Sequence, residues 1–181
     1  INQNVFNRLV KLGPNDNVLP DLAESWEFSD DGLTLTFHLH EGVKWHDGEP
    51  FSSEDVKWTL DMIRTEGFQS NSFKMIEEIT CPDASTVVIQ MSSPSAAILS
   101  SLGWLGTFIL PKHIYEGTDW TANDANMHPI GTGPFKFVKY TPGVSIEMER
   151  NEDYWDGAPY LDKLIISIIP DASTAYQSYL N

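Results

Sequence analysis

The sequence predicts an α/β domain, a mixed α+β chain in which helices and strands follow one another. Residues 33–40 alternate strictly between apolar and polar side chains, which is the pattern of a strand with one buried face. Val56, Leu60 and Ile63 recur at the spacing of one helical face. The run 164–169 is almost entirely apolar, which predicts a strand buried on both faces. In a chain of 181 residues that is 41% hydrophobic, these signals indicate a domain with its own core.

A short helix is expected over residues 2–12. Val5, Leu9 and Leu12 fall on one of its faces, and Gly13, which a proline follows, ends it. The apolar face predicts that this helix packs against the rest of the domain.

A β-hairpin is expected next. Trp26 and Phe28 alternate with polar residues, and the turn 29–32 joins their strand to the alternating segment 33–40. The buried face of the second strand is expected to carry Leu33, Leu35, Phe37 and Leu39, and the outward face Thr34, Thr36, His38 and His40.

A turn at residues 46–50 then precedes a capped helix. Ser52 can cap this helix, and Asp55 follows three residues later, which is the spacing of a capping box. Gly67 is expected to end the helix.

A second hairpin is expected over residues 76–80 and 86–91, followed by a helix over residues 94–102. Ser93 is placed to cap that helix, with a proline in its first position. The stretch 84–111 has no charged residue. Its proline and glycine residues argue against a membrane span and favour a buried helix followed by a buried strand or turn.

The last third returns to strands and closes on a helix. Residues 135–140 and 146–148 predict two strands, and the apolar run 164–169 predicts a third. Asp171 is expected to cap a helix that begins at Ala172 and is still running at the last residue.

The composition argues against several classes of function. With 11 Lys and Arg against 26 Asp and Glu, the formal charge is −15, and a surface this acidic repels nucleic acid and anionic membranes. Cys81 is the single cysteine of the sequence, so neither an internal disulfide nor a cysteine metal cluster can form. No GxSxG motif is present, and no histidine near Cys81 suggests a nucleophile pair.

Two motifs could carry chemistry, and both have a simpler interpretation. His38 and His40 point to one face of a strand and could hold a metal, but no third ligand stands at a recognised spacing, which favours a solvated outer face. Residues 131–134, GTGP, lack the lysine of a phosphate loop and the third glycine of a dinucleotide motif, so a tight strand entry or crossover is expected. No metal, cofactor or catalytic residue is therefore expected.

Two long segments resemble one known family. From Leu19 the chain reads LPDLAESWEFSDDGLTLTFHLHEGVKWHDGEPFSSEDVKWTL. Residues 131–140 read GTGPFKFVKY, and residues 149–171 read ERNEDYWDGAPYLDKLIISIIPD. In this order and spacing they are similar to the family 5 extracellular solute-binding proteins, the oligopeptide-, dipeptide- and nickel-binding receptors of ABC importers. The chain departs from the family pattern at His40, where Arg or Lys is usual, and at Glu152, where Pro is common.

The resemblance implies a fold like the periplasmic binding proteins of type II, in which two lobes close on a ligand. Residues 1–22 and 128–181 resemble part of the first, α/β lobe, with a mixed sheet flanked by helices. Residues 23–127 resemble a β-rich subdomain inserted into that lobe. Because family members have several hundred residues, this chain is expected to be a truncated piece of the first lobe, with the second ligand-binding lobe absent.

The function implied by the resemblance is capture of a small solute outside the cytoplasm, in the periplasm or at the cell surface, for delivery to an ABC permease. An oligopeptide is the leading ligand, with a nickel complex or an oligosaccharide as alternatives. The chain is not expected to be an enzyme. The rival interpretations are a structural or interaction module and, behind it, a metal-dependent enzyme domain.

Five residues are expected to contact the ligand, because ligands of the family lie between the lobes. Phe68, Trp104 and Phe108 are predicted to make apolar contacts. Asn71 and His128 are predicted to make polar contacts.

Two consequences are expected for a fragment of this kind. It should bind its ligand at least about a hundredfold more weakly than the full-length protein, a loss of roughly 2.7 kcal/mol. The strand 164–169 and the helix after it should be left uncovered, so self-association is expected to increase with salt.

Overall fold

The computed structural model describes residues 1–67, 70–104 and 106–180, and these residues form three separate antiparallel sheets. The largest sheet has the order β3-β4-β6-β5, and its strands are β3 (Ala23–Phe28), β4 (Thr34–Leu39), β5 (Ile76–Asp83) and β6 (Thr86–Met91). The second sheet has the order β7-β8-β9, with β7 (Phe135–Thr141), β8 (Ser145–Arg150) and β9 (Lys163–Ser167). The third pairs β1 (Val10–Leu12) with β2 (Val18–Pro20). The expected mixed sheet is therefore not found within the described ranges.

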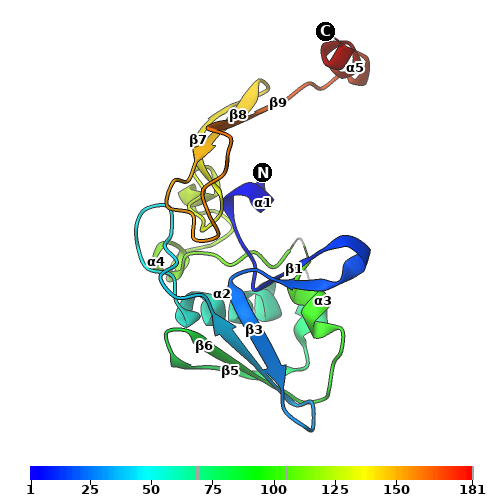
Figure 1. The fold of residues 1–181 in the computed structure, drawn as a ribbon, viewed down its shortest axis with the longest axis vertical. Helices are drawn as coiled ribbons and strands as arrows, with labels where there is room; N and C mark the ends of the chain where they lie inside the picture. The colour runs from blue at the N-terminus through cyan, green and yellow to red at the C-terminus, as the bar shows by residue number, and fades with distance from the viewer. Residues whose placement is uncertain (68–69, 105, 181) are drawn as a thin grey trace.

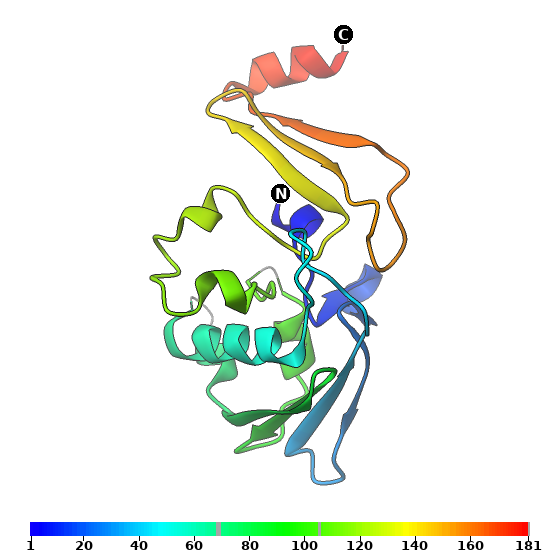
Figure 2. The same ribbon diagram turned by 90° about the vertical axis from the view of Figure 1, so that its left-hand side faces the viewer.

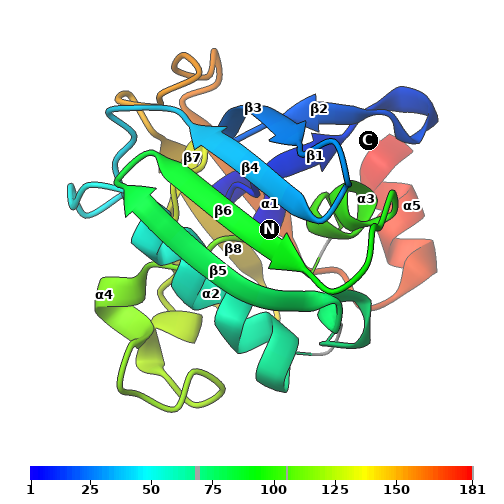
Figure 3. The same ribbon diagram turned by 90° about the horizontal axis from the view of Figure 1, so that it is seen from below.

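The helices lie mostly beside the largest sheet. The longest, α2 (Ser53–Glu66), packs against β5 and β6 and covers one face of that sheet (Figure 3). The shorter ones are α1 (Asn2–Val5), α3 (Ile98–Leu102) and α4 (Lys112–Tyr115), with 3₁₀ turns η1 (Pro14–Asp16), η2 (Ser70–Phe73) and η3 (Asp124–Asn126). The β7-β8-β9 sheet extends from this body and ends in α5 (Ala172–Leu180), which stands apart from the other elements (Figures 1 and 2). No helix in the described part of the chain is long and apolar enough to cross a membrane.

The predicted register of the first hairpin is confirmed. Leu35, Phe37 and Leu39 are buried in the main core, whereas the threonines and histidines that alternate with them are half-exposed. Leu33, also predicted to be buried, is only half-buried and precedes β4. Phe37 pairs with Trp26 across the two strands, and their ring centroids are 6.3 Å apart. Strict alternation therefore decided which face of β4 is buried, because side chains on a strand alternate between its faces.

The capping box of α2 is also confirmed. The Oδ2 atom of Asp55 accepts the backbone N–H of Ser52 at 2.9 Å. The Oδ1 atom accepts the N–H of Lys112 at 2.9 Å, which ties the start of α2 to α4. The apolar stripe Val56, Leu60 and Ile63 is buried, as its spacing predicts.

The predicted cap of the helix before residue 102 is wrong. The helix α3 begins at Ile98 with Ala97 in the N-cap position, so Ser93 caps no helix. Pro94 instead lies against the β3–β4 turn, where a Cβ atom on Gly32 would be 3.3 Å from the Cβ of Pro94. This tertiary contact ties the segment before α3 to the β3–β4 turn.

The two serines give a direct comparison of a used and an unused cap. Replacing Ser52 by alanine is expected to lower the free energy of unfolding by about 1 kcal/mol, because the helix loses a cap that its first turn uses. Replacing Ser93 by alanine should change it by less than about 0.5 kcal/mol. Urea denaturation followed by circular dichroism measures both, and equal losses would contradict the assigned caps.

The predicted helix over residues 2–12 is wrong beyond its first turn. The helix α1 ends at Val5, and the backbone of Phe6 is extended. The N–H groups of Leu22 and Ala23 donate to the carbonyl oxygens of Arg8 and Leu9, both at 2.9 Å. These hydrogen bonds hold the segment in an extended conformation, although Val5 and Leu9 are buried as the helical face predicted.

The prediction that residues 164–169 are buried on both faces is wrong for the chain as described. Ile165 on β9 is 59% exposed, whereas Leu164 and Ile166 pack on the small core under the sheet. β9 is an edge strand, and its second face has no covering layer among the described residues. Self-association through this face stays a prediction.

The cap of α5 is confirmed, since Asp171 accepts the N–H of Thr174 at 2.8 Å.

The glycine-rich segment forms the tight strand entry that its sequence predicts. We call Gly131, Thr132 and Gly133 the glycine crossing, because they pass directly over the backbone of Val5 before β7 begins. The N–H of Gly133 donates to the carbonyl oxygen of Val5 at 2.8 Å. A Cβ atom on Gly131 would lie 1.8 Å from that same oxygen, so no other residue fits there without movement.

Buried polar side chains fasten the crossing to its surroundings. The hydroxyl of Thr132 donates to Oδ1 of Asn7 at 3.0 Å, and Nδ2 of Asn7 donates to Asp21 at 2.7 Å. Burial raises the pKa of the Asp21 carboxyl, and the hydrogen bonds from the Arg8 backbone and from Asn7 partly offset this. Asn151 donates to the carbonyl oxygen of Gly133 at 3.1 Å. The crossing is thus joined to the N-terminal segment and to the loop after β8.

Candidate functional site

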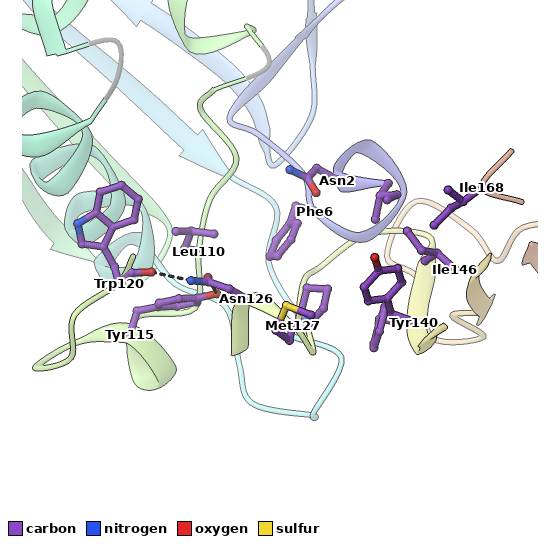
Figure 4. Close-up of a pocket in the computed structure, with 13 residues that line it drawn as sticks. Asn2, Phe6, Leu110, Tyr115, Trp120, Asn126, Met127, Tyr140, Ile146 and Ile168 are labelled. Atoms are coloured by element: carbon purple, nitrogen blue, oxygen red, sulfur yellow. Dashed lines mark hydrogen bonds between the residues drawn. The ribbon is translucent and has the colours of Figure 1, made fainter. Parts of the chain in front are cut away.

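A cavity of about 450 Å³ lies between the segment after α4 and the β7-β8-β9 sheet (Figure 4). This volume is in the range of small-molecule sites in proteins. One wall consists of Leu110, Tyr115, Trp120, Asn126, Met127 and Pro129. The other wall consists of Ile1, Asn2, Phe6, Phe137, Tyr140, Ile146 and Ile168.

Hydrogen bonds fix the first wall. The hydroxyl of Tyr115 donates to Oδ1 of Asn126 at 3.0 Å, and Nδ2 of Asn126 donates to the carbonyl oxygen of Trp120 at 2.9 Å (Figure 4). Asn123 caps η3 by accepting the N–H of Ala125 at 2.8 Å. Burial raises the pKa of the Tyr115 hydroxyl, which therefore stays protonated at neutral pH. The amide of Asn126 thus holds the two aromatic residues of this wall in place.

The second wall is built on one face of the sheet. Phe137 and Tyr140 are three apart on β7, and an irregularity in the β7–β8 register between Phe137 and Lys139 lets both line the same cavity. Ile146 faces them from β8, and Phe6 follows α1. The small core lies next to this wall and is made of Val5, Phe6, Phe135 and Met148.

The lining carries no ionised side chain at neutral pH. None of its described members is Asp, Glu, Lys, Arg or His, although the chain as a whole has a formal charge of −15. The polar side-chain groups are amides, the hydroxyls of tyrosine and the indole N–H of Trp120, which donates to Glu66 at 3.2 Å. A site of this composition can bind and orient a ligand through apolar contact and hydrogen bonds.

Two of the predicted ligand contacts lie near this cavity without lining it. His128 is exposed, and its ring meets that of Phe137 edge-on at 5.8 Å, while its neighbours Met127 and Pro129 line the cavity. Phe108 is half-buried with its ring 6.2 Å from that of Phe6.

Two other predicted contacts come together at a different place. Trp104 is 54% exposed and lines a hollow of about 370 Å³ with Ser72, Ala97, Ser100 and Ser101. Asn71 precedes Ser72 in η2 and is exposed. Phe68 lies outside the described residues. Of the described predicted contacts, Trp104 thus lines this hollow and none lines the 450 Å³ cavity.

Several residues near the two hollows were not found from the sequence. Tyr115, Trp120 and Met127 stand in a loop without periodicity, and the signal that could have found them is the set of aromatic residues among the turn-forming asparagines. Arg8 was missed because the residues that it contacts, Gly103 and Phe108, lie far from it in the sequence. Its Nη1 atom donates to the carbonyl oxygen of Gly103 at 2.8 Å, and its guanidinium lies 5.0 Å from the ring centroid of Phe108. Burial lowers the pKa of Arg8.

His38 on β4 and His40 just after it each face a carboxylate. Nε2 of His38 is 3.8 Å from Glu27, and Nδ1 of His40 is 3.8 Å from Glu24. Across the described ranges, no group of three or more His, Cys, Asp or Glu side chains is arranged to hold a metal ion.

Comparison with known proteins gives a consistent result. The profile of the bacterial extracellular solute-binding proteins, family 5 Middle, matches residues 17–181. A Brucella ovis protein, provisionally named an ABC transporter peptide-binding protein, is 40% identical over 167 residues, which cover 88% of this chain and 31% of that protein. The dipeptide-binding protein of Escherichia coli is 34% identical over 196 residues, which cover 95% of this chain and 36% of that protein.

A solved structure agrees with the sequence matches. The structure of NikZ from Campylobacter jejuni in complex with Ni(L-His) superposes with a TM-score of 0.91 at 34% identity, covering 99% of this chain and 36% of that one. The chain thus spans about a third of the length of the relatives it matches. The match of the family profile over residues 17–181 shows that this chain belongs to the bacterial extracellular solute-binding proteins of family 5.

Proposed function

We propose that this chain is part of the solute-binding component of an ABC importer and that the solute is a peptide. The observation that carries the proposal is family membership together with relatives named for peptide binding. The uncharged cavity supports it, because such a cavity can enclose an apolar part of a peptide. The component would work in the periplasm or at the cell surface and would pass its solute to an ABC permease.

The proposed organisation follows the family plan. Residues 1–22 and 128–181 belong to one α/β lobe, and residues 23–127 form a subdomain inserted into it. Ligand contacts made only in a closed arrangement of lobes would then drive closure around the solute. Trp104, which lines the smaller hollow, is proposed as a ligand contact, with Asn71 beside that hollow and His128 beside the 450 Å³ cavity.

The test is saturation-transfer NMR of the chain with di- to tetrapeptides at millimolar concentration. We expect saturable binding of intact peptides, at least about a hundredfold weaker than to the Escherichia coli dipeptide-binding protein measured alongside, because this chain supplies only part of an enclosing site. Nickel-histidine complex and maltotriose serve as alternative solutes. Hydrolysis of the peptides, or binding of an alternative solute with no peptide binding, would contradict the proposal.

A further inference from the structure

We propose that the 450 Å³ cavity holds an uncharged aromatic or apolar group of the solute, such as the side chain of a tyrosine or leucine residue, and excludes cationic groups. This inference rests on the proposed function and names the part of the solute that occupies this cavity. It concerns the cavity between the α4 loop and the β7-β8-β9 sheet, and not the hollow beside Trp104.

The first argument is the charge of the lining. An ion that leaves water for a concave apolar surface loses its hydration, and only an opposite charge or several hydrogen bonds can compensate for this. No described lining residue has an ionised side chain, and the one charge among these residues is the α-ammonium of Ile1, which is itself a cation. A lysine side chain of a peptide is therefore rejected here, even though the acidic surface attracts cations over longer distances.

The second argument is that the amide of Asn126 in the first wall is already engaged. Asn126 uses its Oδ1 atom to accept from Tyr115 and its Nδ2 atom to donate to Trp120. On the opposite side Asn2 and Tyr140 are exposed, so their polar atoms can also reach water (Figure 4). The cavity thus offers an apolar interior with a polar edge, which suits a phenol ring or an aliphatic group attached to a polar backbone.

The third argument is the kind of apolar surface. Rings of Phe6, Tyr115, Trp120, Phe137 and Tyr140 contribute to the two walls. Aromatic pairs gain from edge-to-face and offset geometries beyond simple burial, and the thioether of a methionine also contacts rings favourably. Met127 supplies that thioether, because it lines the cavity and is 56% exposed. An aromatic group is therefore preferred over an aliphatic group of similar size.

The experiment uses side-chain analogues, so it does not depend on peptide binding. The chain is labelled with ¹³C at the methionine methyl groups and titrated with p-cresol, 3-methylindole and n-butylammonium. We expect p-cresol and 3-methylindole to shift the Met127 methyl signal, and n-butylammonium to leave it unchanged. The signal of Met91, which is buried in the main core, serves as the internal control.

Matched variants on the exposed surface test the location. Met127→Lys is expected to weaken p-cresol binding at least about fivefold, because it places a charge in the cavity. Val138→Lys adds the same charge on β7 at a position that is 50% exposed and outside the lining, and should leave binding unchanged. Ligand-observed NMR gives the affinities of both variants.

The outcomes separate this inference from the proposed function. Failure of p-cresol to shift the Met127 signal, equal binding of n-butylammonium, or equal weakening by the two lysine variants overturns the inference. Peptide binding together with any of these results leaves the proposed function standing. A selective p-cresol shift in a chain that binds no peptide supports the cavity assignment and contradicts the proposed function.

Discussion

Replacing Gly131 by alanine is expected to destabilise the chain by about 3 kcal/mol or more. The added Cβ atom would lie 1.8 Å from the carbonyl oxygen of Val5 and 2.6 Å from its carbonyl carbon. Both obstructing atoms belong to the backbone, so no side-chain rotation can relieve the overlap.

The surrounding hydrogen bonds add to the cost. Any shift that separates the two backbones stretches the bond from Gly133 to Val5 at 2.8 Å. It also stretches the bond from the N–H of His46 to the carbonyl oxygen of Gly131, which is 2.8 Å long. The expected loss is therefore larger than that of an ordinary surface substitution.

The matched control is Gly42→Ala. A Cβ atom on Gly42 meets nothing within 4 Å, but the residue has a φ of +75°, so alanine there costs only backbone strain of about 1 to 2 kcal/mol. Urea denaturation followed by tryptophan fluorescence compares the two variants, and soluble yield with circular dichroism replaces it if Gly131→Ala does not fold. A Gly131→Ala variant that is as stable as Gly42→Ala would show that the crossing is loose.

The β3–β4 hairpin and the segment that contains Arg8 and Leu9 show which structures the sequence can predict. The β3–β4 hairpin was predictable because alternation is a local property, and the residues that pair are close in the chain. The conformation of Arg8 and Leu9 was not, because it depends on hydrogen bonds to Leu22 and Ala23, which lie 14 residues further along. These longer-range hydrogen bonds outweigh the local amphipathic pattern, so the segment is not helical.

The exposure of Ile165 could not be predicted from its own segment. An apolar run has the same sequence whether one or both of its faces are covered, and coverage depends on what packs against the sheet.

The residues that line the cavity could not be predicted from local sequence either. Tyr115, Trp120 and Asn126 converge through hydrogen bonds within an irregular loop, for which no periodic pattern exists. The glycine crossing was predictable from residues 131–134. They lack the lysine of a phosphate loop and the third glycine of a dinucleotide motif, which left a tight strand entry or crossover as the expected structure.

The stability of the chain is expected to fall by about 3 kcal/mol, through His46 alone, as the pH falls from about 7 to about 4. Burial lowers the pKa of this histidine from 6.5 to about 4, and the nearby charge of Lys136 contributes in the same direction. The hydrogen bond to Gly133 and the charge of Asp47 oppose the shift but do not cancel it.

The geometry explains why the neutral ring is preferred. With the proton on Nε2, the ring donates to the carbonyl oxygen of Gly133 at 2.9 Å and accepts the N–H of Gly131 on Nδ1 at 3.3 Å. A second proton on Nδ1 would face the N–H of Gly131, and the crossing would lose that hydrogen bond. The imidazolium would also be largely removed from water.

The sign follows from the two pKa values. In the unfolded chain His46 takes up its proton near pH 6.5, and in the folded chain only near pH 4. The contribution of His46 is therefore complete above pH 6.5 and is lost progressively as the pH falls towards 4. Asp21 and Asp55 act in the opposite direction, because burial raises the pKa of each carboxyl and protonation then favours the folded state.

The substitution His46→Gln separates these effects. Glutamine can keep one donor and one acceptor at the crossing but does not titrate in this range, while Asp21 and Asp55 remain in both proteins. We expect the free energy of unfolding of the parent chain, minus that of the variant, to fall by about 3 kcal/mol between pH 7 and pH 4 in urea titrations. The same comparison with His128→Gln, an exposed histidine, should show a much smaller change. A difference for His46→Gln that does not depend on pH would mean that His46 accepts its proton as readily in the folded chain as in the unfolded one, and that the crossing tolerates a charged ring.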